Sequence, residues 1–371
     1  MTGLRVVHVV SVLAVGGAEM VATTLATRAD GVGRSVVCTS RQDPPFDEAL
    51  RDAGVPVELI PRPAPTPAGI ASAGRALARV LRRERPDLVH SHNPAAGAAA
   101  AVARLLARGI DPALLTTYHG VAPERERTAG LWLALLSDLV VGVSPSVTRT
   151  LLESGVPPRR AATVFNPVWA EPKRPAEEVR HEFDAVGRPL LVSVGRCVEQ
   201  KNQALLLEAL ARLRSRHPTL RALVVGTGPL EDELRRHIHE LDLDDAVSLT
   251  GERVDAVDLI AAADVFALSS RWEALPIALL EAMKLGRPVV VPASAGIVDV
   301  VRDGVTGLLV PIGDLDAFTE AIDRVLADPG LAARLGDAAA TRVSATSAPD
   351  RVLERYGVIY RSLIEGRRAG R

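Results

Sequence analysis

The sequence has few lysine, cysteine and aromatic residues. Lys173, Lys201 and Lys284 are its only lysines, and this scarcity draws attention to Lys201. Aromatic residues make up 3% of the chain, so a large surface for stacking bases or sugar rings is not expected. The two cysteines, Cys38 and Cys197, fall in different halves of the chain and predict neither a disulfide framework nor a metal site.

A strong net charge and a long apolar run are also missing. The formal net charge of −1 argues against a nucleic-acid-binding protein, which should be distinctly basic. No run reaches the roughly 18 apolar residues of a membrane helix. The apolar stretch 4–15 resembles a signal peptide, but it holds His8, has a single early Arg5 and lacks a clear cleavage site, so we interpret it as a buried strand. We expect a cytoplasmic protein, at most peripheral at the inner face of the membrane.

Several well-known motifs are absent or incomplete. The chain has neither a Walker loop nor a Gly-x-Ser-x-Gly motif. The segment VVGTGPLEDEL (224–234) begins like a dinucleotide fingerprint, but Glu231 stands where the third glycine belongs. This argues against an NAD-dependent oxidoreductase. We interpret the segment as a tight strand-to-helix turn near a nucleotide.

The two D-x-D pairs do not predict a metal site. Asp242-x-Asp244 and Asp314-x-Asp316 each lie at a predicted helix boundary. We predict that Asp314 is the N-cap of a helix at 315–327.

Short runs rich in valine and leucine alternate with helical patterns along the whole chain. Strands are predicted at 4–10, 34–39, 55–60, 86–92, 113–119, 138–144, 188–195, 221–226, 246–251, 264–270, 287–292 and 307–311. Helices are predicted between them, in the first half at 17–29, 68–85, 95–108, 126–137 and 145–154. Because the strands lack in/out alternation, we expect them in parallel sheets covered by helices on both faces. The pattern therefore predicts an α/β fold with two doubly wound, Rossmann-like domains, each binding ligands at the carboxyl ends of its strands.

The domain boundary is expected in the segment 166–189, which opens with the proline-rich, charged run NPVWAEPKRPAEE. We predict an N-terminal domain, a linker, a second domain and a C-terminal helix that packs across the junction, at residues 1–168, 169–187, 188–345 and 346–371. In a two-lobed chain of this kind, the cleft between the lobes is the natural ligand site.

The segment SSRWEALPIALLEAMKLGRPVVVP (269–292) is the most informative. Glu273 and Glu281 are eight residues apart, which would place them well off one face of a shared helix, so a helix that starts at Pro276 fits better. Glu273 then precedes a helix N-terminus, where backbone N–H groups and the helix dipole favour phosphate. Glu281 lies in the second turn among apolar residues and needs a hydrogen-bonding partner, such as sugar hydroxyls or a ribose diol. The alternative for Glu281 is a solvated position on an amphipathic helix.

Other segments carry candidate ligand-binding groups. In SVGRCVEQKN (193–202), Arg196 and Lys201 lie between a strand and a helix, which suits a diphosphate, although an ordinary surface loop is the alternative. VGGAEM (15–20) is a glycine-rich turn that would let the backbone approach a ligand. HSHNP (90–94) and TTYHG (116–120) end two predicted strands with histidines, and two such strand ends in one lobe favour a site over structural caps.

A basic stripe on one predicted helix is open to two interpretations. Arg75, Arg79 and Arg82 follow i, i+4, i+7 spacing and would be able to contact anionic lipid. A solvated helix face is the favoured interpretation.

Together these segments resemble the retaining nucleotide-sugar glycosyltransferases of the GT-B fold, in glycosyltransferase family 4. The resemblance spans nearly the whole chain. It rests on GGAE at 16–19, HG at 119–120, GR…EQKN at 195–202, GTGP at 226–229, E-x7-E at 273–281 and RDGVTGLLVPIGD at 302–314. The fold implied is GT-B, with a C-terminal helix that crosses back to the N-terminal domain.

The resemblance also implies roles for individual residues. The catalytic residues would be His119, Arg196, Lys201 and Glu273. The donor site would comprise Gly16, Gly17, Gly195, Arg196, Lys201, Gly226, Gly228, Arg253, Glu273, Ala274, Leu275, Pro276 and Glu281. Glu19, His92, Asn93 and Tyr118 would contact the acceptor.

In these roles, Arg196 and Lys201 hold the donor diphosphate, Glu281 binds the ribose and Glu273 the donor sugar. His119 lies near the anomeric carbon. The anomeric configuration is retained, with the donor phosphate taking the acceptor proton, so no separate catalytic base is needed. No metal and no cofactor is implied beyond the nucleoside-diphosphate sugar. The acceptor would be a sugar, a cyclitol, a lipid-linked sugar or a natural product.

Three stretches depart from the family pattern. The usual glycine-rich stretch after the first glutamate is Ala274-Leu275-Pro276, a variant also seen in the family. The common G-G-x-P-E is Ala295-Gly296-Ile297-Val298-Asp299, which shortens a carboxylate near the donor sugar. The usual N-G at the hinge is Asn166-Pro167.

Two functions other than sugar transfer are also compatible with this resemblance. A nucleotide-sugar epimerase on the same fold would convert the donor without an acceptor, but the E-x7-E spacing with GR…K favours transfer. A degenerate, non-catalytic sugar-nucleotide-binding partner is disfavoured, because Arg196, Lys201, Glu273 and Glu281 are all present.

Overall fold

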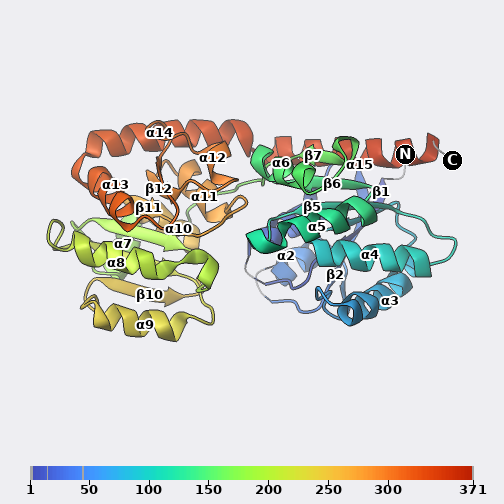
Figure 1. Cartoon of the computed structure of the whole chain (residues 1–371), viewed down its shortest axis with the longest axis horizontal. Coiled ribbons are helices and arrows are strands. Elements are labelled where there is room, and N and C mark those ends of the chain that lie inside the picture. The colour runs from blue at the N-terminus through green and yellow to red at the C-terminus, as the bar shows by residue number, and fades with distance from the viewer. Residues whose placement is uncertain (1–2, 15, 44–45, 370–371) are drawn as a thin grey trace. The chain divides into compact units, whose positions relative to one another are not determined.

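The computed structural model describes residues 3–14, 16–43 and 46–369. The chain forms two compact units, each a parallel sheet with helices on both faces (Figure 1). Unit 1 contains residues 1–167 and 349–371, and unit 2 contains residues 168–348. The predicted fold class is confirmed, with two Rossmann-like α/β units.

Unit 1 has a seven-stranded sheet in the order β3-β2-β1-β4-β5-β6-β7. Its strands are β1 (Leu4–Val9), β2 (Val32–Thr39), β3 (Val57–Leu59), β4 (Leu88–Ser91), β5 (Ala113–Tyr118), β6 (Leu139–Gly142) and β7 (Ala161–Thr163). The order changes direction between β1 and β4, and in such sheets ligands bind at this switch point, beyond the carboxyl ends of the strands.

The described residues of unit 1 form seven α-helices. They are α1 (Gly17–Arg28), α2 (Phe46–Asp52), α3 (Pro67–Glu84), α4 (Pro94–Leu106), α5 (Pro123–Leu136), α6 (Pro145–Glu153) and α15 (Pro349–Ala369). The side chains of Thr66, Asn93 and Ser144 accept a backbone N–H at the starts of α3, α4 and α6, and each is followed by a proline.

Unit 2 has a six-stranded sheet in the order β10-β9-β8-β11-β12-β13. Its strands are β8 (Leu190–Val194), β9 (Arg221–Val225), β10 (Val247–Gly251), β11 (Val265–Ala267), β12 (Val289–Pro292) and β13 (Leu308–Val310). Its helices are α7 (Ala176–Glu182), α8 (Gln203–Leu213), α9 (Glu231–Glu240), α10 (Ala256–Ala262), α11 (Ile277–Lys284), α12 (Ile297–Val300), α13 (Leu315–Ala327) and α14 (Pro329–Thr346). The switch point of this sheet lies between β8 and β11.

Helix α15 belongs to unit 1, although α14 before it belongs to unit 2, so the chain crosses back as predicted. Three arginines of α15 form ion pairs that hold this helix on unit 1: Arg361 with Asp30, Arg367 with both Asp111 and Asp138, and Arg368 with Asp87.

Every predicted strand is present, but β7, α2 and α7 were not predicted, and α7 lies in the segment 169–187 that was expected to be a linker. The starts of α5 and α11 also differ from the prediction. The missed β7 is a three-residue, partly exposed edge strand, and the missed α2 buries one residue, Leu50, so neither has a strong apolar period. Helix α5 starts at Pro123 instead of residue 126. Pro276 is the N-cap of α11 instead of its first residue, and its ψ of 129° is extended. The predicted N-cap Asp314 is confirmed, because its side chain accepts the Ala317 N–H at 2.9 Å.

The basic stripe of α3 is solvent-exposed: Arg75, Arg79 and Arg82 all lie on the outer face of the helix. Arg82 donates to the carbonyl of Leu106 at 2.7 Å, at the end of the neighbouring α4. Among the helices of the described ranges, none combines the length and apolar character needed to cross a bilayer.

Candidate active site

The switch point of unit 2 brings Lys201 and Glu273 together. Lys201 follows β8 and Glu273 follows β11, so both lie beyond the carboxyl ends of adjacent strands. The Lys201 ammonium forms an ion pair with Oε1 of Glu273, and Ser270 Oγ donates to the same oxygen at 2.7 Å. The side chains are 16% and 6% exposed, so this is a nearly buried ion pair. Within the part of the chain that the structure describes, Glu273 Oε2 has no hydrogen-bond or ion-pair partner.

Backbone and side-chain hydrogen bonds join the two loops that carry this pair. The Arg271 N–H donates to the carbonyl of Gln200 at 2.8 Å, and Gln200 Nε2 donates to the carbonyl of Trp272 at 2.9 Å. Ser269 Oγ donates to the carbonyl of Lys201 at 3.0 Å. The ion pair therefore rests on a rigid loop-to-loop contact.

Asn202 ends the first of these loops in the left-handed region, with φ of 49° and ψ of 44°, directly before α8. Asparagine tolerates this conformation better than most residues because its short side chain hydrogen-bonds locally. The turn lets the chain enter α8 immediately after Lys201.

Gly226 and Gly228 of the GTGP segment allow close packing against the loop between β8 and α8, which carries Lys201. A Cβ on Gly226 would overlap the Gly195 carbonyl oxygen, and one on Gly228 would overlap the Cys197 carbonyl oxygen. The Cys197 N–H also donates to the Thr227 carbonyl at 2.8 Å. These contacts give Gly226 and Gly228 a packing role that the sequence did not reveal, beside their predicted place in the donor site.

A second close approach supports the loop after Glu273. A Cβ on Gly296 would overlap the carbonyl oxygen of Ala274, so the backbone before α12 lies directly against Ala274 and Leu275. Pro276 then forms the N-cap of α11. The departure from the family pattern around Gly296 therefore lies in contact with the Glu273 loop.

Glu281 lies on α11, in the second turn as predicted, and is only partly exposed. Its carboxylate has no hydrogen bond or ion pair among the described residues, and burial raises its pKa to about 7. A desolvated carboxylate without a partner is unfavourable unless a ligand supplies donors.

Arg196 and Arg253 are in different electrostatic situations. Arg196 is exposed, and within the described part of the chain its guanidinium has no ion pair. Arg253 is bound by Asp255 at 2.7 Å and Glu182 at 3.0 Å, and it lies over the Phe183 ring. Because two carboxylates already balance Arg253, we leave this predicted donor residue out of the site.

The switch point of unit 1 carries a buried histidine cluster. His8 of β1 is directly in register with His90 of β4. His92 and His119 follow β4 and β5, and the ring centroids of His92 and His119 are 6.1 Å apart. The sequence analysis noted these three strand-end histidines but missed His8 as a member. The parallel register of β1 and β4, which places it there, cannot be read from local sequence.

The predicted acceptor residues are mostly turned inward. His92 and Tyr118 are 1% and 2% exposed, so their side chains are interior groups. Asn93 caps α4 by accepting the Ala96 N–H at 2.9 Å, and it donates to Ser11 Oγ at 3.0 Å. His92 and Tyr118 therefore lie inside unit 1 and Asn93 is partly exposed, while the acceptor contacts of these residues stay a prediction.

At the start of α1, Gly16 is the N-cap and Gly17 the first helical residue. A Cβ on Gly16 would overlap Oε2 of Glu19, so the Glu19 side chain folds back over this turn. Val15, the first residue of the predicted glycine-rich turn, lies outside the described residues.

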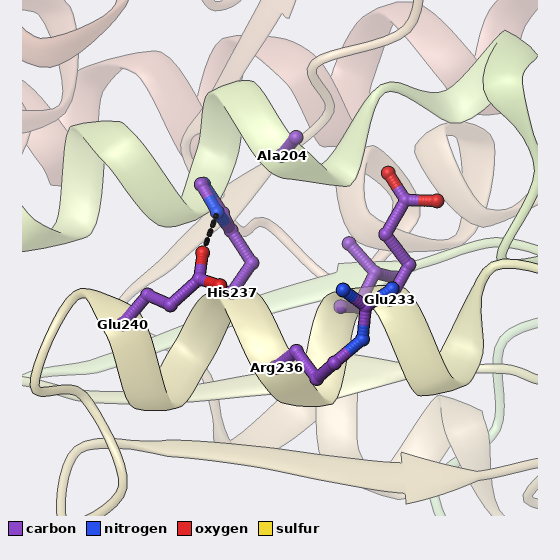
Figure 2. A pocket seen from close by; sticks show the side chains of 6 residues that line it. Ala204, Glu233, Arg236, His237 and Glu240 are labelled. Atoms are coloured by element: carbon purple, nitrogen blue, oxygen red, sulfur yellow. Dashed lines mark ion pairs between the residues drawn. The ribbon is translucent and has the colours of Figure 1, made fainter.

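A separate hollow of about 310 Å³ lies between α8 and α9 (Figure 2). It is lined by Ala204 of α8 and by charged residues of α9, and His237 Nδ1 is 3.6 Å from Glu240. None of the predicted site residues lines it. It lies against the sides of the two helices, from the first turn of α9 at Glu233 to its end at Glu240.

Comparison with known proteins agrees with this arrangement. The family model described as Glycosyl transferases group 1 matches residues 176–342, and the model described as Glycosyltransferase Family 4 matches residues 15–171. The alpha-D-kanosaminyltransferase of Streptomyces kanamyceticus is 27% identical over 310 residues, which are 76% of this chain and 79% of that protein. The UDP-Gal:alpha-D-GlcNAc-diphosphoundecaprenol alpha-1,3-galactosyltransferase of Escherichia coli is 28% identical over 270 residues, covering 68% and 69%.

Among solved structures, the crystal structure of Anabaena Alr3699/HepE in complex with UDP-glucose matches with a TM-score of 0.85 and 22% identity. The match covers 97% of this chain and 100% of that one, and it shows a shared GT-B fold. With matching models on both halves and a shared GT-B fold, the chain belongs to the GT-B glycosyltransferases of family 4, glycosyl transferases group 1.

Proposed function

We propose that this glycosyltransferase moves a sugar from a nucleoside-diphosphate sugar to an acceptor hydroxyl and retains the anomeric configuration. The observation that carries the proposal is the group at the switch point of unit 2. There, Glu273 is held by Lys201 and Ser270, while Glu281 on the next helix has no partner among the described residues. In such a site, the fixed carboxylate of Glu273 binds a sugar ring, and the unpaired carboxylate of Glu281 accepts hydrogen bonds from a diol.

The diphosphate is held by Arg196 and Lys201. Because Lys201 is already paired with Glu273, the exposed guanidinium of Arg196 supplies the net positive charge. Departure of the nucleoside diphosphate builds negative charge on its phosphate oxygens. A fixed charged donor stabilises that state by roughly 2.7–4 kcal/mol, by analogy with oxyanion-hole groups.

Glu281 binds the ribose of the donor. An ionised carboxylate accepts hydrogen bonds from two adjacent hydroxyls, which replace the solvation that it loses by burial. Glu273, oriented through Oε1, presents Oε2 to the hydroxyls of the donor sugar.

His119 contacts the sugar that is transferred, and the donor phosphate takes the proton of the acceptor hydroxyl. This mechanism requires no metal and no further cofactor, because Arg196 and Lys201 supply the charge that opposes the leaving phosphate. The acceptor is a sugar, a cyclitol, a lipid-linked sugar or a natural product. We further propose a cytoplasmic protein whose α3 face, with Arg75, Arg79 and Arg82, contacts anionic lipid when the acceptor is membrane-bound.

A thermal-shift panel of UDP-, GDP-, ADP- and dTDP-sugars tests the donor site. A ligand at 100 times its dissociation constant adds roughly 2.7 kcal/mol to the stability of the folded protein. We expect one nucleotide class to stabilise the wild type and to lose this effect in Glu281→Ala. Glu233→Ala, which removes an exposed carboxylate of α9, is the matched control and should behave as wild type. No stabilisation by any of the four would refute the donor site.

A further inference from the structure

Four histidines share one face of the unit 1 sheet. His8 and His90 are register partners at the switch point between β1 and β4. His92 lies two residues after His90, and His119 lies two residues after Thr117 of β5. Because side chains alternate across a strand with a period of two, this spacing sends the histidines and Thr117 to the same side.

The rings form a row that runs from the interior to the surface. The His90 and His92 rings are 4.2 Å apart, and the His92 and His119 rings are 6.1 Å apart, with interplanar angles of 28° and 24°. His8 Nδ1 lies 3.3 Å from His92 Nε2. His8, His90 and His92 are fully buried, whereas His119 is partly exposed. His119 is therefore the end of the row that a substrate can reach.

Two tyrosines of α15 close the buried end of the row. Tyr356 and Tyr360 are one turn apart on the same face of the helix. The Tyr360 hydroxyl is 2.7 Å from His90 Nδ1, and Thr117 Oγ1 is 2.7 Å from His90 Nε2. The Tyr356 hydroxyl is 3.0 Å from Thr117 Oγ1. Both ring nitrogens of His90 are thus held by groups that depend on α15.

The protonation state of the row follows from its burial. Burial lowers the pKa of His8 to about 3 and of His119 to about 4, and it holds the pKa values of His90 and His92 well below the ordinary value. All four rings are neutral at pH 7, and a neutral imidazole donates from one nitrogen and accepts at the other. The two hydroxyl partners of His90 therefore hold both of its ring nitrogens and fix its ring plane.

A metal ion is the competing explanation, because His8, His90 and His92 offer ligand atoms within 4.8 Å of one another. Three neutral imidazoles suit zinc. However, His90 would have to give up its bond to Tyr360 or to Thr117 in order to bind the ion. The hydrogen-bonded network accounts for the contacts without this loss.

We propose that Tyr360 acts through His90, and Tyr356 through Thr117, as positioning residues for His119. The proposal rests on the proposed function, in which His119 contacts the transferred sugar. Tyr360 fixes the His90 ring, on which His92 and then His119 are stacked. Tyr356 holds Thr117, two residues before His119 on the same chain segment. The C-terminal helix in this way sets the orientation of a substrate-contacting imidazole.

The test compares Tyr360→Phe and Tyr356→Phe in the full-length protein. Tyr360→Phe removes the hydroxyl that bonds to His90 Nδ1, so we expect kcat to fall about tenfold, or about 1.4 kcal/mol, with the KM for the nucleotide sugar unchanged. The ¹⁵N resonances of the His90 and His119 rings should shift. Tyr356→Phe should have a smaller effect, because Thr117 still bonds to His90.

Ile364→Val is the matched control, since this buried residue lies on the same helix and has no polar side-chain atom. It should lose stability but keep kcat and the imidazole spectra. If Tyr360→Phe behaves like Ile364→Val, its role is structural only and the proposal is wrong. One bound zinc per chain, lost in His8→Ala, would also overturn it. If the wild type transfers no sugar, the proposed function fails, and the His119 resonances still decide whether Tyr360 positions that ring.

Discussion

The ammonium group of Lys201 is paired with the carboxylate of Glu273, and both side chains are nearly buried. The two residues are 72 positions apart in the chain and meet because β8 and β11 are neighbours in the sheet. Ser270 binds the same carboxylate oxygen. The pair therefore joins the two loops that follow β8 and β11.

Lys201→Ala should lower both stability and activity. It leaves the Glu273 carboxylate buried without its cation, and breaking a buried ion pair costs about 3–5 kcal/mol. We expect kcat to fall at least about 100-fold, as for other groups that stabilise developing charge. Thermal unfolding and a product assay measure the two effects. Lys284→Ala, at an exposed lysine bound to Ser344, is the control, and an equal loss there would argue against a specific role for Lys201.

Arg196→Ala and Arg253→Ala should separate ligand binding from stability. Arg196 is exposed and has no ion pair within the described ranges, so its loss should change stability by less than about 0.5 kcal/mol. Nucleotide affinity should fall roughly tenfold or more, because a charge-assisted bond to phosphate is lost. Arg253→Ala should destabilise unit 2 by about 1 kcal/mol and leave affinity unchanged, because its partners are Asp255 and Glu182. Calorimetric titration with the preferred nucleotide, together with thermal melts, checks both. If Arg253→Ala lowered nucleotide affinity and Arg196→Ala lowered only stability, Arg253 would be the phosphate-binding residue and Arg196 the structural one.

The raised pKa of Glu281 predicts that nucleotide affinity depends on pH. The ionised carboxylate is the form that accepts two ribose hydroxyls, and burial raises its pKa from 4.5 to about 7. Affinity should therefore increase as pH rises through about 7 and then level off. Glu281→Gln should bind more weakly and show no such step. Titrations between about pH 5.5 and 8.5 measure this, and the same step in the variant would assign it to another group.

The raised pKa of Glu281 also predicts that the free energy of unfolding of the ligand-free protein changes with pH. Because the folded pKa of Glu281 is raised, the folded state holds this proton more tightly than the unfolded chain does. Its contribution to the free energy of unfolding should fall as pH rises from about 4.5 to about 7, by roughly 2–3 kcal/mol. In Glu281→Gln this fall should be absent. Denaturant unfolding across that range measures the difference between the two curves, and parallel curves would contradict the prediction.

Gly296→Ala should displace the loop that carries Glu273. The new Cβ would overlap the carbonyl oxygen of Ala274, so the backbone must move. We expect a loss of about 1–3 kcal/mol in stability, with a larger relative loss in kcat. Gly366→Ala is the control, because a Cβ there meets open space. Unchanged transfer by Gly296→Ala would show that this contact does not hold the site.

The sequence predicted the parts of the fold that depend on local pattern. Valine- and leucine-rich runs identified the strands, and Asp314 identified the start of a helix, because burial periods and capping are local properties. The motif carrying Glu273 and Glu281 predicted that site in the same way. In contrast, β7 and α2 bury too little apolar surface to leave a period, and they were missed.

Residue types and spacing alone determined that this chain is a two-unit α/β protein with cations and carboxylates at strand ends. Tertiary structure decided which of those groups meet. It paired Lys201 with Glu273, tied Arg253 to Asp255 and Glu182, and turned His92 and Tyr118 inward. It also joined His90 to Tyr360, 270 positions away. Strand order and register set these pairings, and both arise from contacts between distant segments that no local pattern records.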